Sequence, residues 1–373
     1  MFPARDDQPN YFPSPDKCSG EPLISMSEVV KVFKNAGGEF TALNRVTACF
    51  YAGEFVSVVG KSGSGKSTLV NMLTGIDHPT SGTVRVSDID IHRLSENDMS
   101  VWRGNNLGIV FQFFQLLPTL TLLENVMLPM YLIGKYAPAE REERALRLLE
   151  RVGLRGMEDK LPAAVSGGQQ QSAAIARALA NDPPIIIADE PTGNLDSRAA
   201  EEVFDLFTNL IDAGKTVLVV THDISLAKRT SRTLLLSDGE LINPWVAHAL
   251  PRLAHSEMLW LTHHVQPVSY PAGALLPIDD ENSEWLWLVT AGQIDLVEAT
   301  TTGGGRLIAS LPGGSFLAGR EIQPGWLAHA GADRPLELLV VAGADFTHWC
   351  DQHPAVWTGL KQSRRLHPFS GGQ

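Results

Sequence analysis

In the stretch FVSVVGKSGSGKST, from Phe55 to Thr68, a short apolar run leads directly into a glycine-rich turn. The run contains β-branched residues and predicts a buried strand, and residues 60–68 fit the pattern GxxxxGK followed by Ser or Thr. Glycines in such a turn let backbone N–H groups surround phosphates, Lys66 adds a positive charge at the β- and γ-phosphates, and the Ser67 hydroxyl can bind Mg²⁺. A glycine-rich turn with an incidental lysine is the alternative, but the preceding strand favours a nucleotide-binding loop.

Two acidic residues follow a second apolar run, residues 184–188. Ligands bind at the carboxyl ends of strands in open α/β sheets, so Asp189 and Glu190 are candidates for a site there. Asp189 is expected to hold Mg²⁺ through water, and Glu190 to orient and polarise the attacking water. A solvated acid pair at a strand end is the alternative, since such runs are common on their own. The acidic pair indicates a functional site here because the same chain also contains the phosphate-binding loop.

Two further polar side chains follow apolar runs. His222 comes after the run 216–220, and a neutral imidazole there can reach a γ-phosphate or the attacking water. A lone histidine after a strand is more often structural. Gln112 follows Val110 and Phe111, and its amide can bind Mg²⁺, although a lone glutamine is usually a surface residue.

The stretch VSGGQQQS, residues 165–172, is typical of a helix start. Ser166 can cap the helix, and the two glycines let a backbone or a ligand come close. The first turn of a helix attracts anions. No lysine follows to complete a phosphate site, so the rest of any such site must lie elsewhere.

Composition limits the class of protein. The formal net charge of −12 argues mildly against a nucleic-acid-binding protein, which usually has a basic face. Three cysteines, Cys18, Cys49 and Cys350, are far apart and fit free thiols in a reducing compartment without structural zinc. No apolar run approaches the roughly 18 residues that cross a bilayer. Residues 1–21 are polar and proline-rich, which predicts a flexible tail rather than a signal peptide.

The rest of the chain changes character near Asn243. Before it, strand and helix signals alternate, which predicts an α/β sheet of buried parallel strands, and residues 140–152 predict an amphipathic helix. After it come seven of the eight tryptophans, helical signals at 253–264 and short strand-like runs that predict an antiparallel sandwich or barrel. The expected division is a tail at 1–21, an α/β domain with the nucleotide-binding loop at 22–243, a linker and lead-in helix at 244–265, and a β domain at 266–373.

These motifs, in this order, resemble the ATP-binding cassette (ABC) superfamily, the ATPase subunits of ABC transporters, over about residues 22–243. The resemblance implies a P-loop NTPase fold with a RecA-like core, a β subdomain and a helical subdomain. It also implies hydrolysis of ATP with Mg²⁺. Phe33 matches the aromatic residue that stacks on adenine, where tyrosine is commoner. The resemblance implies three sets of site residues. The catalytic residues are Lys66, Gln112, Glu190 and His222, and the metal-site residues are Ser67, Gln112 and Asp189. The ATP-binding residues are Phe33, Gly60, Ser62, Gly63, Ser64, Gly65, Lys66, Ser67 and Thr68.

The resemblance also gives the glycine-rich helix start a meaning. Residues 165–169 resemble the family signature motif, usually LSGGQ, which binds the γ-phosphate of ATP held by a second cassette. One cassette in the chain therefore implies a homodimer that closes head to tail on two ATP molecules. Asn194-Leu195-Asp196 matches the D-loop, and Ser172 stands where close relatives usually have arginine. The implied signature residues are Ser166, Gly167, Gly168 and Gln169.

A closer resemblance, in residues 111–126 and 189–196, is to the ATPases of lipoprotein release, macrolide and peptide export, and cell division. In that subgroup the ATPase dimer transmits force to two membrane subunits. The resemblance implies a peripheral location on the cytoplasmic face of the inner membrane, with integral membrane permease subunits as partners. Four apolar residues near Gln112 fit a contact with such a subunit, and ordinary core packing is an equal alternative: Phe113, Phe114, Leu116 and Leu117.

Residues 266–373 resemble the cyclic nucleotide-binding domain, an eight-stranded jelly roll, mainly through glycines at turn positions. The phosphate site departs from that family. Extra residues follow Phe316, and Trp326 stands at the position of the phosphate-binding arginine, with Arg320 and Arg334 elsewhere. Loss of the guanidinium removes a bidentate contact. We expect a degenerate domain that binds no cyclic nucleotide and serves as a dimer contact, regulatory cap or dock.

Two other functions are alternatives. One is a soluble ABC ATPase acting on ribosomes or DNA, although the first kind usually has two cassettes and the second a long coiled coil. The other is a regulator that gates a membrane protein without transport, which the sequence leaves open. The pair Arg364-Arg365 is too short for a membrane or nucleic-acid patch. A metal site is disfavoured at four histidines because no acid or cysteine completes a ligand spacing: His248, His255, His263 and His264.

Overall fold

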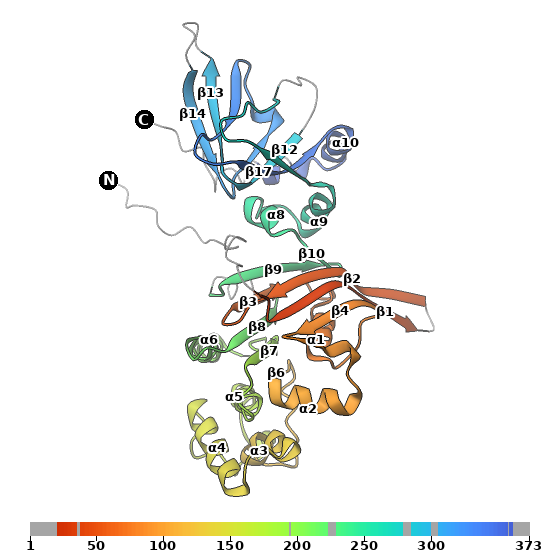
Figure 1. The fold of residues 1–373 in the computed structure, drawn as a ribbon. Coiled ribbons are helices and arrows are strands. Elements are labelled where there is room, and N and C mark those ends of the chain that lie inside the picture. Colours follow the sequence, from red (N-terminus) through yellow and green to blue (C-terminus); the bar gives the residue numbers. More distant parts are fainter. Residues whose placement is uncertain are drawn as a thin grey trace, which may run out of the picture. The chain divides into compact units, whose positions relative to one another are not determined.

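The computed structural model divides between Leu241 and Ile242 into two compact units, and each is described by itself (Figure 1). Almost all of the predicted tail lies outside the described residues, as do Cys18, Asn194 and the arginine pair at 364–365. The described residues are 21–35, 38–193, 195–222, 229–278, 285–299, 305–356 and 358–360.

A six-stranded sheet forms the centre of the first unit, as far as the described residues show, in the order β10-β9-β3-β8-β7-β6. Neighbours pair in parallel except β10 with β9. Every residue of β3, β7 and β8 is buried, which explains why these strands read as continuous apolar runs and confirms the α/β prediction. The strands are β3 (Phe55–Val59), β6 (Leu107–Val110), β7 (Ile185–Asp189), β8 (Thr216–Thr221), β9 (Arg232–Ser237) and β10 (Glu240–Leu241).

Alternate residues of β7 enter two different hydrophobic cores, because strand side chains alternate between the faces of a sheet. Ile185 and Ile187 pack with α1 and an antiparallel sheet of order β2-β1-β4-β5. Ile186 and Ala188 pack with helices α3 to α6. The predicted amphipathic helix is α4. The elements are β1 (Ile24–Asn35), β2 (Gly38–Phe50), β4 (Ser81–Val86), β5 (Ile89–Asp90), α1 (Lys66–Thr74), α2 (Glu96–Asn106), α3 (Leu122–Ile133), α4 (Pro138–Arg151), α5 (Gly167–Ala178) and α6 (Ser197–Asp212).

Two antiparallel sheets share one core in the second unit, in the orders β11-β17-β12-β15 and β14-β13-β16. On β13, Ile294 and Leu296 are buried and alternate with less buried residues, as expected for a sandwich. The rings of Trp285 and Trp287 stack in this core with centroids 4.3 Å apart. The strands are β11 (Gln266–Tyr270), β12 (Trp285–Ala291), β13 (Gln293–Ala299), β14 (Gly305–Pro312), β15 (Phe316–Ala318), β16 (Trp326–Ala330) and β17 (Leu336–Ala342).

Helices α8 (Pro244–Ala249), α9 (His255–His264) and α10 (Ala344–Gln352) complete the second unit. The predicted lead-in helix begins at His255 rather than at residue 253, since Ala254 is extended and its N–H donates to the Glu257 carboxylate. The rings of Trp260 and Trp349 stack at 4.1 Å and join α9 to α10. Among the helices that the structure describes, none is both long and apolar enough to cross a membrane.

Candidate active site

The turn after β3 has a backbone that requires glycine. A Cβ on Gly60 would lie 2.3 Å from the carbonyl oxygen of Leu236. Gly63 and Gly65 have φ angles of +81° and +101°, in the left-handed region that side chains disfavour. Helix α1 begins directly after this turn at Lys66, and a glycine-rich turn closed by a helix start is an arrangement that binds phosphate.

Lys66 lies inside the turn with its ammonium group held by backbone carbonyls. The residue is 8% exposed, and Nζ donates to Gly60 O at 2.9 Å and to Lys61 O at 3.1 Å. Nζ also lies 3.7 Å from Glu190 Oε1. A buried charge without partners is costly, so these contacts fix the cation within the turn.

Asp189 and Ser67 form a pair of oxygen donors beside Lys66. Ser67 lies close enough to the Asp189 carboxylate to favour its charged form. Burial raises the pKa of Asp189, the charge of Glu190 raises it further, and Ser67 and Lys66 oppose the rise. Asp189 Oδ1 and Ser64 Oγ are buried, and the described residues supply neither with a hydrogen-bond partner. Such atoms are costly, and a hard cation with phosphate oxygens would satisfy both, so the residues fit Mg²⁺ and a nucleotide phosphate.

Glu190 follows β7 in a left-handed conformation with φ of +47°, which is uncommon for a residue other than glycine. Its N–H donates to Val220 O at 2.8 Å. One carboxylate oxygen accepts a hydrogen bond from Thr221 Oγ1 at 3.2 Å and lies 2.8 Å from His222 Nδ1. The structure thus brings Lys66, Glu190 and His222 together. The sequence analysis missed Thr221, although its place directly before His222 was a usable signal.

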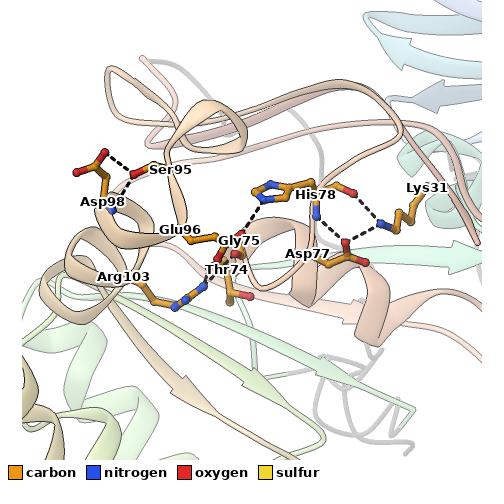
Figure 2. Close-up of polar contacts among 9 residues, drawn as sticks. All are labelled: Lys31, Thr74, Gly75, Asp77, His78, Ser95, Glu96, Asp98 and Arg103. Atoms are coloured by element: carbon orange, nitrogen blue, oxygen red, sulfur yellow. Dashed lines mark hydrogen bonds and ion pairs between the residues drawn. The ribbon is translucent and has the colours of Figure 1, made fainter.

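The carboxyl end of α1 is anchored by Arg103 of α2, as Figure 2 shows. The guanidinium donates to Thr74 O at 3.2 Å and to Gly75 O at 2.9 Å. These carbonyls belong to the last turn and cap of α1, which lacks intrahelical partners for them, and a cation there also favours the helix dipole. Arg103 therefore stabilises the helix that carries Lys66, and the sequence analysis did not single it out.

Lys31 joins the same end of α1 to strand β1 (Figure 2). Its Nζ donates to Asp77 Oδ1 at 2.6 Å and to His78 O at 2.8 Å. The same Nζ lies 5.1 Å from the ring centroid of Phe33, the predicted adenine-stacking residue. Phe33 is 40% exposed, so a face of its ring is accessible to a planar base.

In the predicted signature turn, the polar groups at the helix start hydrogen-bond to one another. Ser166 Oγ accepts from Gln169 N at 3.3 Å, and Gln169 Oε1 accepts from Ser166 N at 3.0 Å. This reciprocal pair is a capping box at the start of α5. A Cβ on Gly168 would lie 3.5 Å from the side chain of Ala199, in the first turn of α6. The predicted D-loop residue Asp196 caps α6 by accepting from Ala199 N at 2.9 Å.

Ser172 lies on α5 beside a groove of about 290 Å³ that Glu202 and Asp205 of α6 also line. An arginine at this position would place a guanidinium beside these carboxylates. In this chain Arg229 donates to Asp205 Oδ1 at 2.7 Å instead. Ser172 takes no part in the capping box of Ser166 and Gln169, and it brings no charge to the groove that Glu202 and Asp205 line.

The segment after Gln112 divides into exposed and packed residues. Gln112 is half-buried directly after β6. Phe113 is 74% exposed and Leu117 is 44% exposed, which fits the predicted contact surface. Leu116 packs against the core of α3 to α6, which fits the alternative prediction of core packing, and Phe114 is half-buried.

In the second unit, the turn after Phe316 becomes a short helix, η4 (Gly319–Glu321). A carboxylate oxygen of Glu321 accepts from Ala318 N at 3.0 Å. Trp326 begins β16, Arg334 is exposed, and the side chain of Arg320 lies outside the described residues. Within the described part of the chain, including the histidines of α8 and α9, no three His, Cys, Asp or Glu residues lie where they could hold a metal ion.

Comparisons with known proteins match the first unit. The family model described as ABC transporter matches residues 43–193. An uncharacterised ABC transporter ATP-binding protein of Methanocaldococcus jannaschii is 46% identical over 225 residues, which cover 59% of this chain and 95% of that protein. The lipoprotein-releasing system ATP-binding protein of Idiomarina loihiensis is 43% identical over 220 residues, covering 59% of this chain and 96% of that protein. This chain belongs to the ABC transporter ATP-binding proteins.

A solved structure agrees with this assignment. A dimeric ATP-binding cassette in a post-hydrolysis state, bound to ADP and phosphate, is 43% identical and gives a TM-score of 0.57 over 59% of this chain and 97% of its own. The P-loop cassette fold predicted from the motifs is thus confirmed. The chain is an ATPase of the ABC type, and the strands of its second unit form two antiparallel sheets outside the matched residues.

Proposed function

We propose that two copies of this chain close on two ATP molecules, each bound by the 60–68 turn of one copy and the Ser166–Gln169 turn of the other. The observation that carries the proposal is the cluster of Lys66, Asp189 and Glu190 at the carboxyl ends of β3 and β7. The signature turn is separate from this cluster, at the start of α5. The related cassette bound to ADP and phosphate is dimeric, which supports a homodimer. A pair related by a two-fold axis closes at two copies.

Within one copy, the turn positions the substrate. Backbone N–H groups of the turn and the hydroxyl groups of Ser62, Ser64 and Thr68 donate to the phosphates, and Lys66 supplies charge at the β- and γ-phosphates. Lys66 gives up its carbonyl contacts, at 2.9 and 3.1 Å, to do so. Phe33 stacks on adenine. These contacts place the γ-phosphate beside Glu190.

Glu190 then acts as the base for the attacking water. The water oxygen bonds to the γ-phosphorus, its proton passes to the Glu190 carboxylate, and the bond to the β–γ bridging oxygen breaks to leave ADP. His222, 2.8 Å from the carboxylate, orients it and contacts the γ-phosphate. Thr221 holds the same oxygen at 3.2 Å. Preorganised contacts of this kind are what phosphoryl transfer mainly requires.

We propose that Mg²⁺ is bound by Ser67 directly, by Asp189 through water and by Gln112. When bound, the ion neutralises charge on the β- and γ-phosphates. The unpartnered Asp189 Oδ1 and the closeness of Ser67 to Asp189 support this set. Gln112 precedes the exposed side chain of Phe113, so the binding of Mg²⁺ by Gln112 depends on the position of this segment.

The dimer would work on integral membrane permease subunits at the cytoplasmic face of the inner membrane, in a transporter that transmits force for lipoprotein, peptide or drug export. Support comes from the relative named for lipoprotein release and from the exposed side chains of Phe113 and Leu117. Purification from native membranes in mild detergent tests this role. A stoichiometric integral membrane partner is expected, and recovery of ribosomes or nucleic acid would contradict it.

We propose that the chain consists of a tail at 1–21, an ATPase domain at 22–243, a linker and lead-in helix at 244–265, and a C-terminal domain at 266–373. The C-terminal domain is a degenerate cyclic nucleotide-binding-like domain. Glu321 places a carboxylate on the N–H of Ala318, where a phosphate would meet repulsion. Trp326 offers no charge in place of the arginine. The domain then acts as a dimer contact or regulatory surface rather than as a nucleotide receptor.

The variant Glu190→Gln tests the ATPase proposal. Removing the base should abolish turnover while leaving ATP binding intact, so the variant is expected to accumulate as an ATP-bound dimer in sedimentation experiments. Wild-type protein should stay mostly monomeric because hydrolysis reopens it. Hydrolysis by Glu190→Gln at the wild-type rate would show that another group is the base.

A further inference from the structure

The backbone directly after the half-buried Gln112 and exposed Phe113 has an unusual conformation. Phe114 and Gln115 have φ angles of +55° and +50°, so two consecutive residues other than glycine are left-handed. Such residues persist only where surrounding contacts fix them. The contacts that fix this pair therefore decide how the segment is held.

Arg177, in the last turn of α5, provides those contacts. Its guanidinium donates to Phe114 O at 2.7 Å and also to Gln115 O. Arg177 is half-buried, and burial lowers the pKa of its guanidinium. The two carbonyls accept its hydrogen bonds, and the planar guanidinium holds both of them in a fixed geometry through parallel donors.

The other end of α5 touches the same segment. Gly167 is the first residue of α5 and follows the signature serine, Ser166. A Cβ on Gly167 would lie 3.9 Å from the tip of the Phe114 ring, so the ring lies near the signature turn with room for little more than a methyl group between them. Phe114 is thus near the start of α5 through its ring and is bonded to Arg177 at the end of α5 through its carbonyl.

The segment has room to rearrange. A groove of about 200 Å³ is lined by Phe111, Gln115 and Arg177, with residues of α2 and α3 on its other sides. Because Phe113 and Leu117 are exposed on the same segment, force on these side chains would act on the backbone that Arg177 holds.

We propose that Arg177 is a positioning residue that couples the 113–117 segment to the signature turn, by fixing the Phe114–Gln115 backbone so that the Phe114 ring supports Gly167 and Ser166. The inference rests on the proposed function, in which the signature turn binds ATP held by the partner. Its consequence is that Arg177 sets the affinity of the ATP-bound dimer while leaving ATP binding within one copy unchanged.

The full-length chain carrying Glu190→Gln provides the assay, because its ATP-bound dimer does not turn over. Arg177→Met keeps the apolar stem and removes the donors, and Arg177→Lys keeps the charge but replaces the planar fork with a compact ammonium on a shorter stem. Arg144→Met is the matched control. Arg144 donates to Ala180 O at 2.6 Å and to Leu179 O at 3.5 Å, carbonyls at the end of the same helix on its α4 side. Thermal melting, ATP binding at monomeric protein concentrations and the dimer dissociation constant are measured for each.

Arg177→Met and Arg177→Lys should both weaken the ATP-bound dimer, Arg177→Met by at least about tenfold and Arg177→Lys by less, with ATP binding to the monomer unchanged within about twofold. Arg144→Met should lower thermal stability without a comparable loss of dimer affinity. Adding Phe114→Leu to an Arg177 variant should cost less than the sum of the two changes, because both act through one contact.

Unchanged dimer affinity in Arg177→Lys and Phe114→Leu, in a parent that dimerises with ATP, would overturn the coupling and leave the proposed function intact. Equal losses in the Arg144 and Arg177 variants would also overturn it, since Arg177 would then act through stability alone. A parent that binds ATP but never dimerises would overturn both proposals. If Arg177→Met fails to fold, Arg177→Lys and Phe114→Leu still decide the question.

Discussion

Two helix starts contain glycine, one before Lys66 and one after Ser166, and they differ in whether their polar groups have hydrogen-bond partners within the chain. At the first, positive φ angles and a carbonyl 2.3 Å from any Gly60 Cβ impose glycine, and buried Ser64 Oγ has no partner among the residues described. At the second, Ser166 and Gln169 satisfy each other in a capping box. A Cβ on Gly168 would meet only ordinary contacts.

The difference teaches that glycine serves two purposes in one ATPase. In the first turn it permits a backbone that other residues rarely adopt, beside a buried hydroxyl without a partner among the described residues. In the second it leaves a bare surface on a helix start that is already complete. This difference fits the proposal that the first turn binds ATP within one chain and that the second turn meets ATP held by another copy. The variants below each change one of the two turns.

Gly60→Ala and Gly168→Ala give the largest contrast. Gly60→Ala should destabilise the first unit by about 2–4 kcal/mol, because its Cβ meets a backbone oxygen of β9 that cannot move without disturbing the sheet. Gly168→Ala should leave stability unchanged or raise it by up to about 1 kcal/mol, since alanine favours the helix. Calorimetry of each variant measures both effects. Similar melting temperatures for the two variants would contradict the distinction.

Lys66→Met and Ser166→Ala separate binding in one chain from binding between chains. Lys66→Met should abolish ATP binding by the monomer. Ser166→Ala should lose about 0.5–2 kcal/mol of helix capping and keep monomer ATP binding, but lose ATP-dependent dimerisation. Titration calorimetry and sedimentation report the two properties.

Mixing these two variants supplies the control. Neither should hydrolyse ATP alone, but a mixed dimer contains one intact site, with Lys66 from one copy and Ser166 from the other. Partial recovery of hydrolysis on mixing is expected. An inactive mixture, with both variants folded, would count against a site shared between copies.

The same contrast shows what the sequence can predict. The strands β3, β7 and β8 and the phosphate turn were predictable, because buried parallel strands are continuous apolar runs and the turn's constraints are local. The contacts of Glu190 with Thr221 and of Arg177 with Phe114 were not. They join residues 31 and 63 positions apart through side-chain geometry that no periodicity encodes. The sequence thus predicts residues for the reaction, and it does not indicate the side chains that hold them in place.

Asp189→Asn, measured without Mg²⁺ in EDTA, gives the smallest effect and isolates the electrostatics of the first turn. Burial raises the pKa of Asp189 in the folded protein, so the folded state favours the protonated acid. That contribution to stability is fully present below the unfolded pKa of about 3.9 and is lost as pH rises through the folded pKa. At neutral pH the wild type therefore keeps a poorly solvated carboxylate, and asparagine removes that charge.

The melting temperature of Asp189→Asn should accordingly be a few degrees higher than that of the wild type at pH 7, since each 1 kcal/mol of stability corresponds to roughly 2–4 °C. This difference in melting temperature should shrink as the pH falls toward 4. Hydrolysis with Mg²⁺ should be lost in the same variant. Ser166→Ala is the matched comparison: no titrating group takes part in its capping box, so its deficit relative to wild type should be the same at both pH values. A gap for Asp189→Asn that stays constant with pH would mean that its carboxylate is not desolvated, and the first turn would then resemble the second in being complete without a ligand.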